Sequence, residues 1–345
     1  MPAAVCRTRA INLVGERLTP AEELAKQDWL RGLRGSVAST AAVWQAAKVA
    51  NRKDPVTERV TESVTEYNAG PPIASLVPPG HCVFGEEWTP TPLVKKQWIG
   101  HDTLLLTFGL QGAQSLGLST CACLLARGAA PSDGGEPIIR PYTPVSTNAM
   151  LGAFQLMVKV TDFFGSWKHE PALAMSQQLA RLPIGGLVDF KHIKFNVKLQ
   201  YPFRARNIVM LVGGTGIAPM LQALHALLGT PTDPSRTTLL YSSKSQEDIL
   251  AKGTLDEWEA SHPDRLGVQH TLTREPEGSD WTGRRGRIDA ALLHEQLPPP
   301  SDDVLIFVCG PPAMYDALSG PRTEPEALTG LLADMGYSAE QVVKF

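Results

Sequence analysis

The sequence predicts a two-domain α+β protein in which an antiparallel β-barrel is followed by a doubly wound parallel α/β domain. From Trp88 to about Pro202, short apolar runs alternate with glycine, proline and serine, a pattern typical of small antiparallel barrels. After Arg206, wholly apolar runs alternate with helical patterns, as expected for parallel strands buried on both faces. We therefore assign residues 1–87 to an N-terminal extension, 88–202 to the barrel domain and 203–345 to the α/β domain.

Length and composition agree with this division. The chain has 345 residues, enough for two cores and an extension, since domains commonly contain about 100–200 residues. Lys+Arg 32 against Asp+Glu 35 gives a formal net charge of -3, which argues against nucleic acid as a partner. No stretch reaches the roughly 18–20 apolar residues of a membrane-spanning helix, so we expect none and leave peripheral membrane association open.

The extension has the pattern of a partly helical segment. Thr19–Glu22 resembles a capping box with proline at the first helical position, and small or apolar residues then recur every fourth residue up to Leu33. Ser36–Asn51 is rich in alanine, and Asn68–Gly80 contains the prolines and glycines of a linker. We expect a short amphipathic helix and a linker here, without a separate core.

The first 19 residues are basic, with Arg7, Arg9 and Arg17 against Glu16 alone. Two interpretations are open, a mitochondrial presequence and a disordered tail. On this basis we favour a mitochondrial over a cytoplasmic location and leave open whether the start is cleaved.

In the barrel domain the strand-like runs are Thr103–Phe108, Ala122–Leu125 and Phe154–Val160. Cys121 and Cys123 flank the start of the second run, and alternation along a strand predicts that both are small core residues on one face. The five cysteines are odd in number, scattered and without a Cys-x-x-Cys pair, which indicates reduced thiols in an intracellular protein and no metal site.

The α/β domain shows a regular alternation of strand-like and helical segments, which predicts right-handed crossovers around a parallel sheet. The expected strands are Ile208–Val212, Thr238–Tyr241, Val268–Leu272 and Val304–Cys309. The expected helices are Met220–Leu228, Asp248–Ala260 and Ile288–Leu297.

Two of these strands lead into turns suited to a dinucleotide. The first runs into Gly213-Gly214-Thr215-Gly216, followed by Pro219 at a helix start, where glycines allow close approach and free amides favour a pyrophosphate. The last runs into Cys309–Met314, which contains Gly310 and Pro311. Because ligands of open α/β sheets bind beyond the carboxyl ends of the strands, both turns should face one crevice.

A third segment, Arg140–Ser146, lies in the barrel domain. In an extended chain Arg140 and Tyr142 point the same way, one suited to a phosphate and the other to an aromatic ring face. By itself this segment is also compatible with an ordinary edge strand.

Together these segments resemble the flavin- and NADH-dependent reductases of the ferredoxin reductase superfamily, and within it the cytochrome b5 reductase family. The resemblance covers roughly residues 88–345. It is carried by RPYTPVS (140–146), AMSQQL (174–179), LVGGTGIAPM (211–220), CGPPAM (309–314) and the closing Phe345.

The resemblance implies a six-stranded flavin-binding barrel that holds FAD, and an α/β domain that binds NADH. Thr143 would lie near the reactive edge of the flavin and Cys309 near the carbon that gives up hydride, so these two are the expected catalytic residues. The implied cofactor-binding residues are Arg140, Pro141, Tyr142, Thr143, Met157, Lys159, Met175, Ser176, Gly213, Gly214, Thr215, Gly216, Pro219, Asp248, Cys309, Gly310, Pro311 and Met314.

Asp248 matches the acid that favours NADH, since a carboxylate accepts from ribose hydroxyls and repels a 2′-phosphate. Arg284, Arg285 and Arg287 form a basic cluster where the family has neutral residues. Such a cluster would suit NADPH, but we favour an ordinary solvated charge run.

The chain also departs from the family pattern around the diphosphate. Ala172-Leu173-Ala174 replaces Gly-Gly-Lys, and Lys191 or Lys194 would then supply the missing charge. Thr161 replaces a tyrosine beyond the strand that carries Lys159. These changes leave FMN open as an alternative to FAD.

The resemblance implies hydride transfer from NADH to FAD and then single-electron transfer to a haem-protein acceptor such as cytochrome b5. Because the cofactor carries the chemistry, no protein acid or base is required. Lys95 and Lys96 are candidates for attracting an acidic acceptor. Two alternatives stay open: another acceptor, or a catalytically inactive accessory subunit of a larger assembly that retains the fold.

Overall fold

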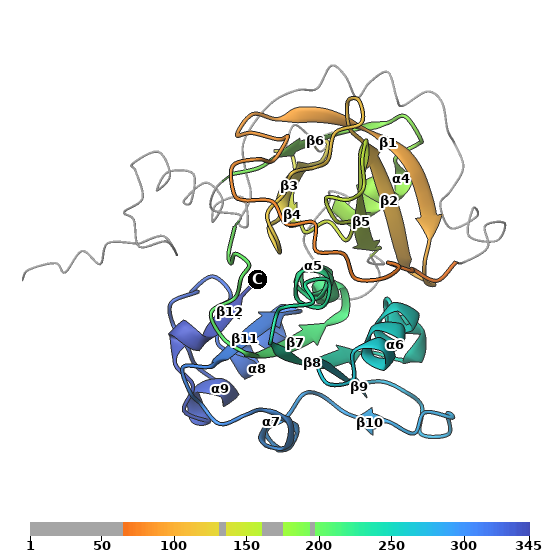
Figure 1. Ribbon diagram of the computed structural model, residues 1–345. Helices are drawn as coiled ribbons and strands as arrows, with labels where there is room; N and C mark the ends of the chain where they lie inside the picture. Colours follow the sequence, from red (N-terminus) through yellow and green to blue (C-terminus); the bar gives the residue numbers. More distant parts are fainter. Residues whose placement is uncertain (1–64, 131–135, 161–174, 194–196) are drawn as a thin grey trace, which may run out of the picture.

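The computed structural model describes residues 65–130, 136–160, 175–193 and 197–345. Two sheets lie one above the other, with the barrel domain on top and the α/β domain below (Figure 1). The helix expected over residues 19–33, the basic N-terminus and Thr161 fall outside the described residues. Among the helices that the structure describes, none is long and apolar enough to cross a membrane.

The first sheet has six antiparallel strands in the order β4-β3-β6-β1-β2-β5. Four phenylalanines fill its core, with neighbouring ring centroids 4.9–5.8 Å apart. The elements are β1 (Thr89–Trp98), β2 (Thr103–Gly109), β3 (Leu124–Arg127), β4 (Ile139–Tyr142), β5 (Ala153–Lys159), the helix α4 (Met175–Arg181) and β6 (Leu187–Lys191). The predicted six-stranded antiparallel fold is confirmed.

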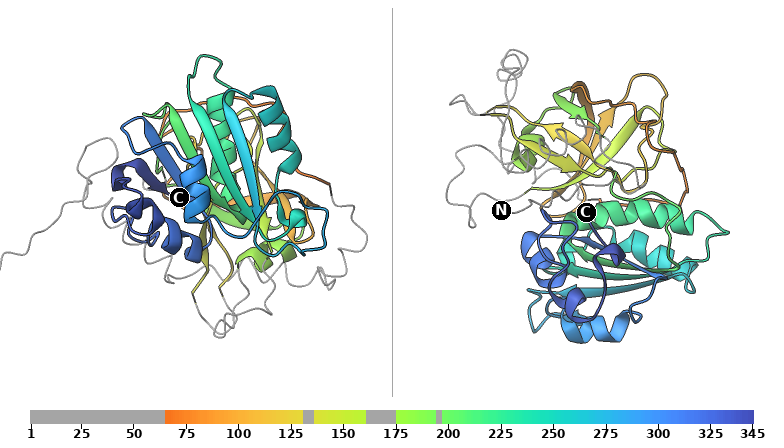
Figure 2. Two further views of the ribbon diagram at one scale, coloured as in Figure 1. Left: turned by 90° about the horizontal axis from the view of Figure 1, so that it is seen from below. Right: turned by 90° about the vertical axis from the view of Figure 1, so that its left-hand side faces the viewer.

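The second sheet has six parallel strands in the order β10-β9-β8-β7-β11-β12, with helices on both faces (Figure 2). Its strands are β7 (Asn207–Gly213), β8 (Arg236–Ser243), β9 (Leu266–Leu272), β10 (Arg284–Arg285), β11 (Val304–Cys309) and β12 (Val342–Lys344). Its helices are α5 (Ile217–Leu228), α6 (Lys252–Ser261), α7 (Ala290–Gln296), α8 (Pro312–Leu318) and α9 (Leu331–Asp334). This is the predicted doubly wound domain.

The side chains of the central strand β7 alternate between the two faces of the sheet. Met210 and Val212 pack in the cluster that contains α5 and α6. Val209 and Leu211 pack in the cluster that contains α7, α8 and α9. A strand buried on both faces needs apolar residues at every position, which is why Ile208–Val212 is an unbroken apolar run.

Several predicted boundaries are shifted; the helices expected from Met220 and Ile288, for example, begin at Ile217 and Ala290. Two further shifts have a cause in a left-handed residue. The helix expected from Asp248 begins only at Lys252, because residues 246–248 form a 3₁₀ turn capped by Ser245 and Ala251 then takes a left-handed φ of 59°. The strand expected from Ala122 begins at Leu124, because the left-handed Cys121 (φ 62°) lies in a turn that precedes the strand. Asp248 is thereby buried beneath a turn, and its side chain points towards the other domain.

Residues 65–79, which we call the strap, belong to the predicted extension but pack against both domains. Tyr67 is 5% exposed and donates its hydroxyl to Val145 O in the barrel domain (3.2 Å). On the α/β side, Trp258 donates to Gly70 O (2.8 Å), and Ile73 N–H donates to Nδ1 of His225 (3.0 Å). The strap therefore ties the two domains together by backbone and side-chain hydrogen bonds.

Direct contacts between the domains converge near the start of α5. Gln222 donates to the carbonyls of Pro144 (2.8 Å) and Ser146 (2.6 Å), and the thiol of Cys121 contacts Pro219 O at 3.2 Å. These bonds hold the end of the Arg140–Ser146 segment against the helix that follows the glycine turn.

Candidate functional site

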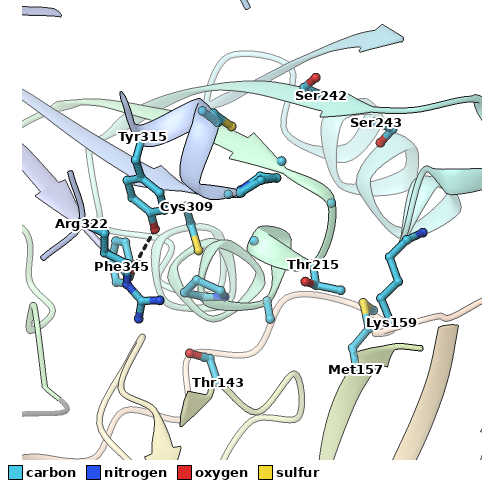
Figure 3. A pocket seen from close by; sticks show the side chains of 18 of the residues that line it. Thr143, Met157, Lys159, Thr215, Ser242, Ser243, Cys309, Tyr315, Arg322 and Phe345 are labelled. Atoms are coloured by element: carbon cyan, nitrogen blue, oxygen red, sulfur yellow. Dashed lines mark hydrogen bonds between the residues drawn. The ribbon is translucent and has the colours of Figure 1, made fainter. Parts of the chain in front are cut away.

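A cleft of about 1080 Å³ lies between the two domains and is lined by both (Figure 3). Thr143 lies on the barrel side of this cleft, opposite Cys309 and Thr215. The structure brings together all the residues predicted for cofactor binding, since each lines the cleft: Arg140, Pro141, Tyr142, Thr143, Met157, Lys159, Met175, Ser176, Gly213, Gly214, Thr215, Gly216, Pro219, Asp248, Cys309, Gly310, Pro311 and Met314.

The glycine turn after β7 and the turn after β11 pack directly on each other. A Cβ at Gly216 would lie 2.1 Å from Cys309 O, and one at Gly213 would lie 2.8 Å from Pro311 Cδ. Gly214 differs, because its φ is +54° and a Cβ there would meet nothing within 4 Å. Two glycines therefore permit packing between the turns, while Gly214 leaves backbone open to the cleft.

On the barrel side, β4 presents Arg140 and Tyr142 to the cleft, as the extended segment predicts. Both are half-buried, and the Arg140 guanidinium donates to its neighbour Ile139 O at 2.9 Å. Burial raises the pKa of Tyr142, so its phenol stays neutral near pH 7. The segment thus offers a cation and a neutral aromatic face within one cleft.

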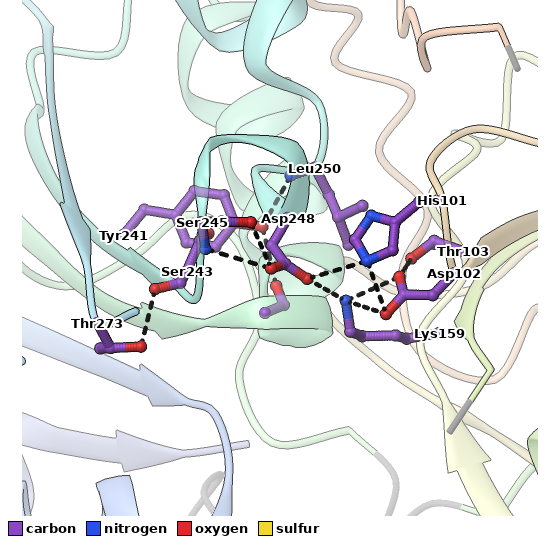
Figure 4. Close-up of polar contacts among 11 residues, drawn as sticks. His101, Asp102, Thr103, Lys159, Tyr241, Ser243, Ser245, Asp248, Leu250 and Thr273 are labelled. Atoms are coloured by element: carbon purple, nitrogen blue, oxygen red, sulfur yellow. Dashed lines mark hydrogen bonds and ion pairs between the residues drawn. The ribbon is translucent and has the colours of Figure 1, made fainter. Parts of the chain in front are cut away.

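Lys159 at the end of β5 forms an ion-pair cluster with acids from both domains (Figure 4). Its Nζ lies 2.7 Å from Asp102 Oδ2 and 2.6 Å from Asp248 Oδ1. The second carboxylate oxygen of Asp248 accepts from the hydroxyl (2.9 Å) and the N–H (3.2 Å) of Ser245. His101 Nε2 stands 3.8 Å from Asp248 Oδ1. Both carboxylate oxygens of Asp248 are therefore engaged.

The pKa values in this cluster follow from these contacts. Burial by itself would raise the pKa of Asp248, but the hydrogen bond and charge of Lys159 outweigh burial and hold it below its ordinary value. Burial would lower the pKa of Lys159, but its hydrogen bonds to Asp102 and Asp248 raise it overall. Both groups are accordingly charged at neutral pH.

The thiols near the cleft are protonated at neutral pH. Burial raises the pKa of Cys309 to about 11, although the positive charge of Arg322 opposes the shift. Cys121 is a buried core residue, as predicted, but neither Cys121 nor Cys123 lies on a strand, and both line the cleft. The left-handed turn at Cys121 precedes the strand and brings both residues to the cleft.

The basic residues singled out from the sequence have different environments. Arg284 pairs with Asp289 (2.8 Å), and Arg285 donates to the carbonyls of Glu275 and Trp281, each at 3.1 Å. Arg284 and Arg285 therefore make local contacts at the surface, whereas Arg287 lines the cleft.

Of the lysines suggested as replacements near the diphosphate, Lys191 does not line the cleft. Lys191 lies over the Trp88 ring, 4.7 Å from its centroid, and Lys194 falls outside the described residues. Lys198, which the sequence did not single out, lines the cleft.

Sequence reasoning missed other cleft residues because they carry no motif. Some of them lie just beyond a strand, a place that could have suggested them, whereas the others lie within a strand, within a helix or in a loop and carry no such signal. The missed residues are Ser242, Ser243, Lys244, Thr273, Arg274, Tyr315 and Arg322.

The residues present fit a flavin dinucleotide together with a pyridine dinucleotide. The cleft is at the upper end of the roughly 300–1,000 Å³ of ordinary small-molecule sites. It combines the cations Arg140, Lys198 and Arg322, which suit phosphates, with the open backbone at Gly214.

Comparison with known proteins agrees with this geometry. The family described as Oxidoreductase FAD-binding domain matches residues 90–198, and the family described as Oxidoreductase NAD-binding domain matches residues 210–319. The chain is also similar to the cytochrome b5 reductase domain of Ulva prolifera nitrate reductase. That crystal structure has a TM-score of 0.65 and 28% identity, over 80% of this chain and 100% of that one.

Among sequence relatives, the protein named NADH-cytochrome b5 reductase 2 of Emericella nidulans is 36% identical over 266 residues. These residues are 75% of this chain and 78% of the relative. The protein of the same name from Aspergillus clavatus is 37% identical over 270 residues, 76% of this chain and 79% of the relative. With both oxidoreductase domains, the shared fold and this identity over most of its length, the chain belongs to the cytochrome b5 reductase family.

Proposed function

We propose that this protein is a flavoprotein reductase that uses NADH to reduce bound FAD and passes single electrons to a haem protein such as cytochrome b5. One observation carries the proposal. The Arg140–Thr143 segment and both glycine-containing turns, three segments far apart in the sequence, line a single cleft. The names of the relatives, NADH-cytochrome b5 reductase 2, support the same donor and acceptor.

On the barrel side, the chain's task is to bind and align. Arg140 offers its guanidinium to a flavin phosphate, and Tyr142 offers a neutral ring face. The Met175 and Ser176 amides at the start of helix α4 line the cleft and, together with Lys198, would receive the diphosphate. Bound FAD supplies the redox chemistry, accepting hydride and releasing electrons one at a time.

On the α/β side, neither the glycine turn nor the turn after β11 contains an acidic or basic side chain. Cys309 keeps its proton, since its pKa is raised to about 11. We infer that Cys309 acts by packing beside the nicotinamide, opposite Thr143 on the barrel side of the cleft. This arrangement suits hydride transfer, which depends on alignment more than on proton transfer.

Of the two lysines proposed to attract an acidic acceptor, Lys95 and Lys96, the structure leaves only Lys95 as a candidate. Lys95 is exposed, but Lys96 donates its ammonium to Ala180 O (3.1 Å) and Leu182 O (3.4 Å). We therefore retain only Lys95 as a docking charge for an acidic acceptor. Lys95→Glu should slow acceptor reduction at low salt without changing flavin reduction by NADH.

The decisive experiment is a visible spectrum of the purified protein, followed by addition of NADH without oxygen. Flavin bands that bleach on addition of NADH, and reoxidation by cytochrome b5, are the expected results. A protein that stays colourless after incubation with FAD and FMN would refute the proposal and favour the inactive accessory subunit. Bleaching without cytochrome b5 reduction would leave a reductase with another acceptor.

We also propose a mitochondrial location, supported by Arg7, Arg9 and Arg17 in the N-terminal segment. Import into isolated mitochondria, with and without Arg→Gln substitutions at these positions, tests it. After sonication at low salt, a free protein would stay in the supernatant, whereas a peripherally associated protein would sediment with the membranes and be released from them by carbonate.

A further inference from the structure

We propose that the cleft also accepts a 2′-phosphorylated dinucleotide, NADPH, and that Lys244, Arg274 and Arg287 hold its 2′-phosphate. The inference rests on the proposed function, because it concerns the adenosine end of the same donor site. It concerns residues outside the motifs that identify the family.

The three cations come from the ends of three adjacent parallel strands. Lys244 directly follows β8, Arg274 is the second residue after β9, and Arg287 is the second residue after β10. The sheet order β10-β9-β8 makes these ends neighbours. Two backbone bonds fix them together: Arg274 N–H donates to Lys244 O (2.7 Å), and Gly286 N–H donates to Leu272 O (2.8 Å). The cations therefore lie along one edge of the cleft.

That edge is where a dinucleotide would place its adenosine. The glycine turn follows β7, and β8 is the next strand on the side leading to β9 and β10. Figure 3 shows Ser242 and Ser243 on the Lys159 side of the pocket, away from Cys309 and Arg322. A dinucleotide with its nicotinamide near Cys309 and its phosphates on the turn would point its adenosine ribose towards this edge.

The side chains of these cations are available. Lys244, Arg274 and Arg287 are exposed and line the cleft, and among the described residues none of their charged groups forms an ion pair or side-chain hydrogen bond. Arg284 and Arg285 lie close by in sequence but are held by Asp289 and by backbone carbonyls. Lys244, Arg274 and Arg287 line the cleft, whereas Arg284 and Arg285 do not.

Among the described residues that line the cleft, Asp248 is the one acid, and its charge is already compensated. Asp248 is 8% exposed, and Lys159 Nζ lies 2.6 Å from one of its carboxylate oxygens, while Ser245 binds the other. An acid whose charge is compensated and whose oxygens are occupied repels an added anion weakly. The local balance at this edge is therefore positive, which favours a phosphate over a plain hydroxyl.

The test compares NADH with NADPH in anaerobic flavin reduction at low and at physiological salt. We expect NADPH to reduce the flavin with a kcat/KM within about tenfold of that for NADH, and the NADPH-to-NADH ratio of kcat/KM to fall as salt rises. The triple variant Lys244→Gln, Arg274→Gln, Arg287→Gln should lower the NADPH-to-NADH ratio of kcat/KM by at least about tenfold, the loss of a few charge-assisted bonds. All three sites are exposed, so folding is not at risk.

Arg236→Gln is the matched control, because Arg236 is an exposed cation at the opposite end of β8 and does not line the cleft. It should leave the ratio unchanged. Calorimetry with 2′,5′-ADP and 5′-AMP supplies a reading that does not depend on turnover. The wild type should bind 2′,5′-ADP more tightly than 5′-AMP, and the triple variant should lose that preference.

The two proposals fail in different ways. If NADH bleaches the flavin while NADPH does not, or if the triple variant keeps the ratio, the phosphate site is wrong and the reductase stands. If NADH itself fails to bleach the flavin, the proposed function is wrong. The calorimetric preference for 2′,5′-ADP then still decides whether these cations hold a 2′-phosphate.

Discussion

Gly216 and Gly214 stand two residues apart in one turn, yet each position requires glycine for a different reason. Gly216 has an ordinary right-handed conformation (φ −58°), so its backbone would accept any residue. What excludes a side chain is the backbone of Cys309, which a Cβ would approach to 2.1 Å. At Gly214 the space is open, and the left-handed φ of +54° is what favours glycine.

We therefore expect Gly216→Ala to reduce stability by roughly 3 kcal/mol or more, since two backbone segments must separate. Gly214→Ala should cost only about 1 kcal/mol in urea unfolding, the strain of one left-handed residue. It should weaken NADH binding nonetheless, because its methyl group enters the cleft. Equal losses of stability in the two variants would contradict this assignment.

Cys309 is predicted to act as a protonated spacer. With a pKa of about 11, only about one thiol in 3,000 is ionised at pH 7.5, so alkylation by iodoacetamide should be far slower than for an ordinary thiol. Between pH 7 and 9, the rate of flavin reduction by NADH should depend on pH in the same way in the wild type and in Cys309→Ala. A pH-dependent limb lost in that variant would show that the thiolate takes part.

At the scale of elements, the strap and helix α5 meet at a buried histidine. His225 is 4% exposed, packs against Trp258 with ring centroids 4.7 Å apart, and accepts the Ile73 N–H on Nδ1. Burial lowers its pKa to about 4. Protonation would put a charge in the core and remove the acceptor that holds the strap.

The sign of the pH effect follows from this shift. The folded pKa lies below the unfolded value of about 6.5, so the stabilisation is complete above that value and is lost as the pH falls towards 4. Between pH 7.5 and 5 we expect His225 to account for a loss of roughly 2 kcal/mol in the free energy of unfolding. His225→Asn, whose amide oxygen replaces Nδ1 but does not titrate, should lack this loss in urea titrations at the two pH values. An unchanged pH dependence would contradict it.

At the scale of the whole molecule, the Lys159–Asp248 pair joins the domains across the cleft. Replacing Lys159 by Met would leave Asp102 and Asp248 facing each other with only His101 nearby. We expect a loss of about 3 kcal/mol in unfolding free energy at pH 7, because buried acids lose their compensating charge. Lys95→Met, which removes an exposed lysine from β1, is the control and should change stability little.

The pH dependence separates this explanation from simple loss of packing. In the wild type the pKa of Asp248 lies below its unfolded value, so its stabilisation is lost only as the pH falls below about 4. In Lys159→Met the buried acids should have raised pKa values, and the variant should recover stability relative to the wild type between pH 7 and 5. A deficit that stays constant with pH would indicate packing alone.

The sequence by itself determined the fold class and the segments that build the site. The unbroken apolar run of β7, the glycine turn after it and the Arg140–Thr143 segment are local patterns, and their conformations follow from burial on two faces and from backbone geometry. In the structure these segments have the conformations that their local patterns predict. The predicted starts at Asp248 and Ala122 were wrong because the left-handed residues Ala251 and Cys121 precede the helix and the strand, and nothing in the sequence indicates that an alanine or a cysteine takes this conformation.

Only the tertiary structure decided which charges meet. Lys159 and Asp248 are 89 residues apart, His225 and Ile73 are 152 apart, and the cations after β8, β9 and β10 share an edge only because the sheet order makes those strands neighbours. No periodicity or spacing encodes such pairs. They depend on how two domains dock and how strands are ordered, and these are set by the burial of whole faces rather than by any single segment.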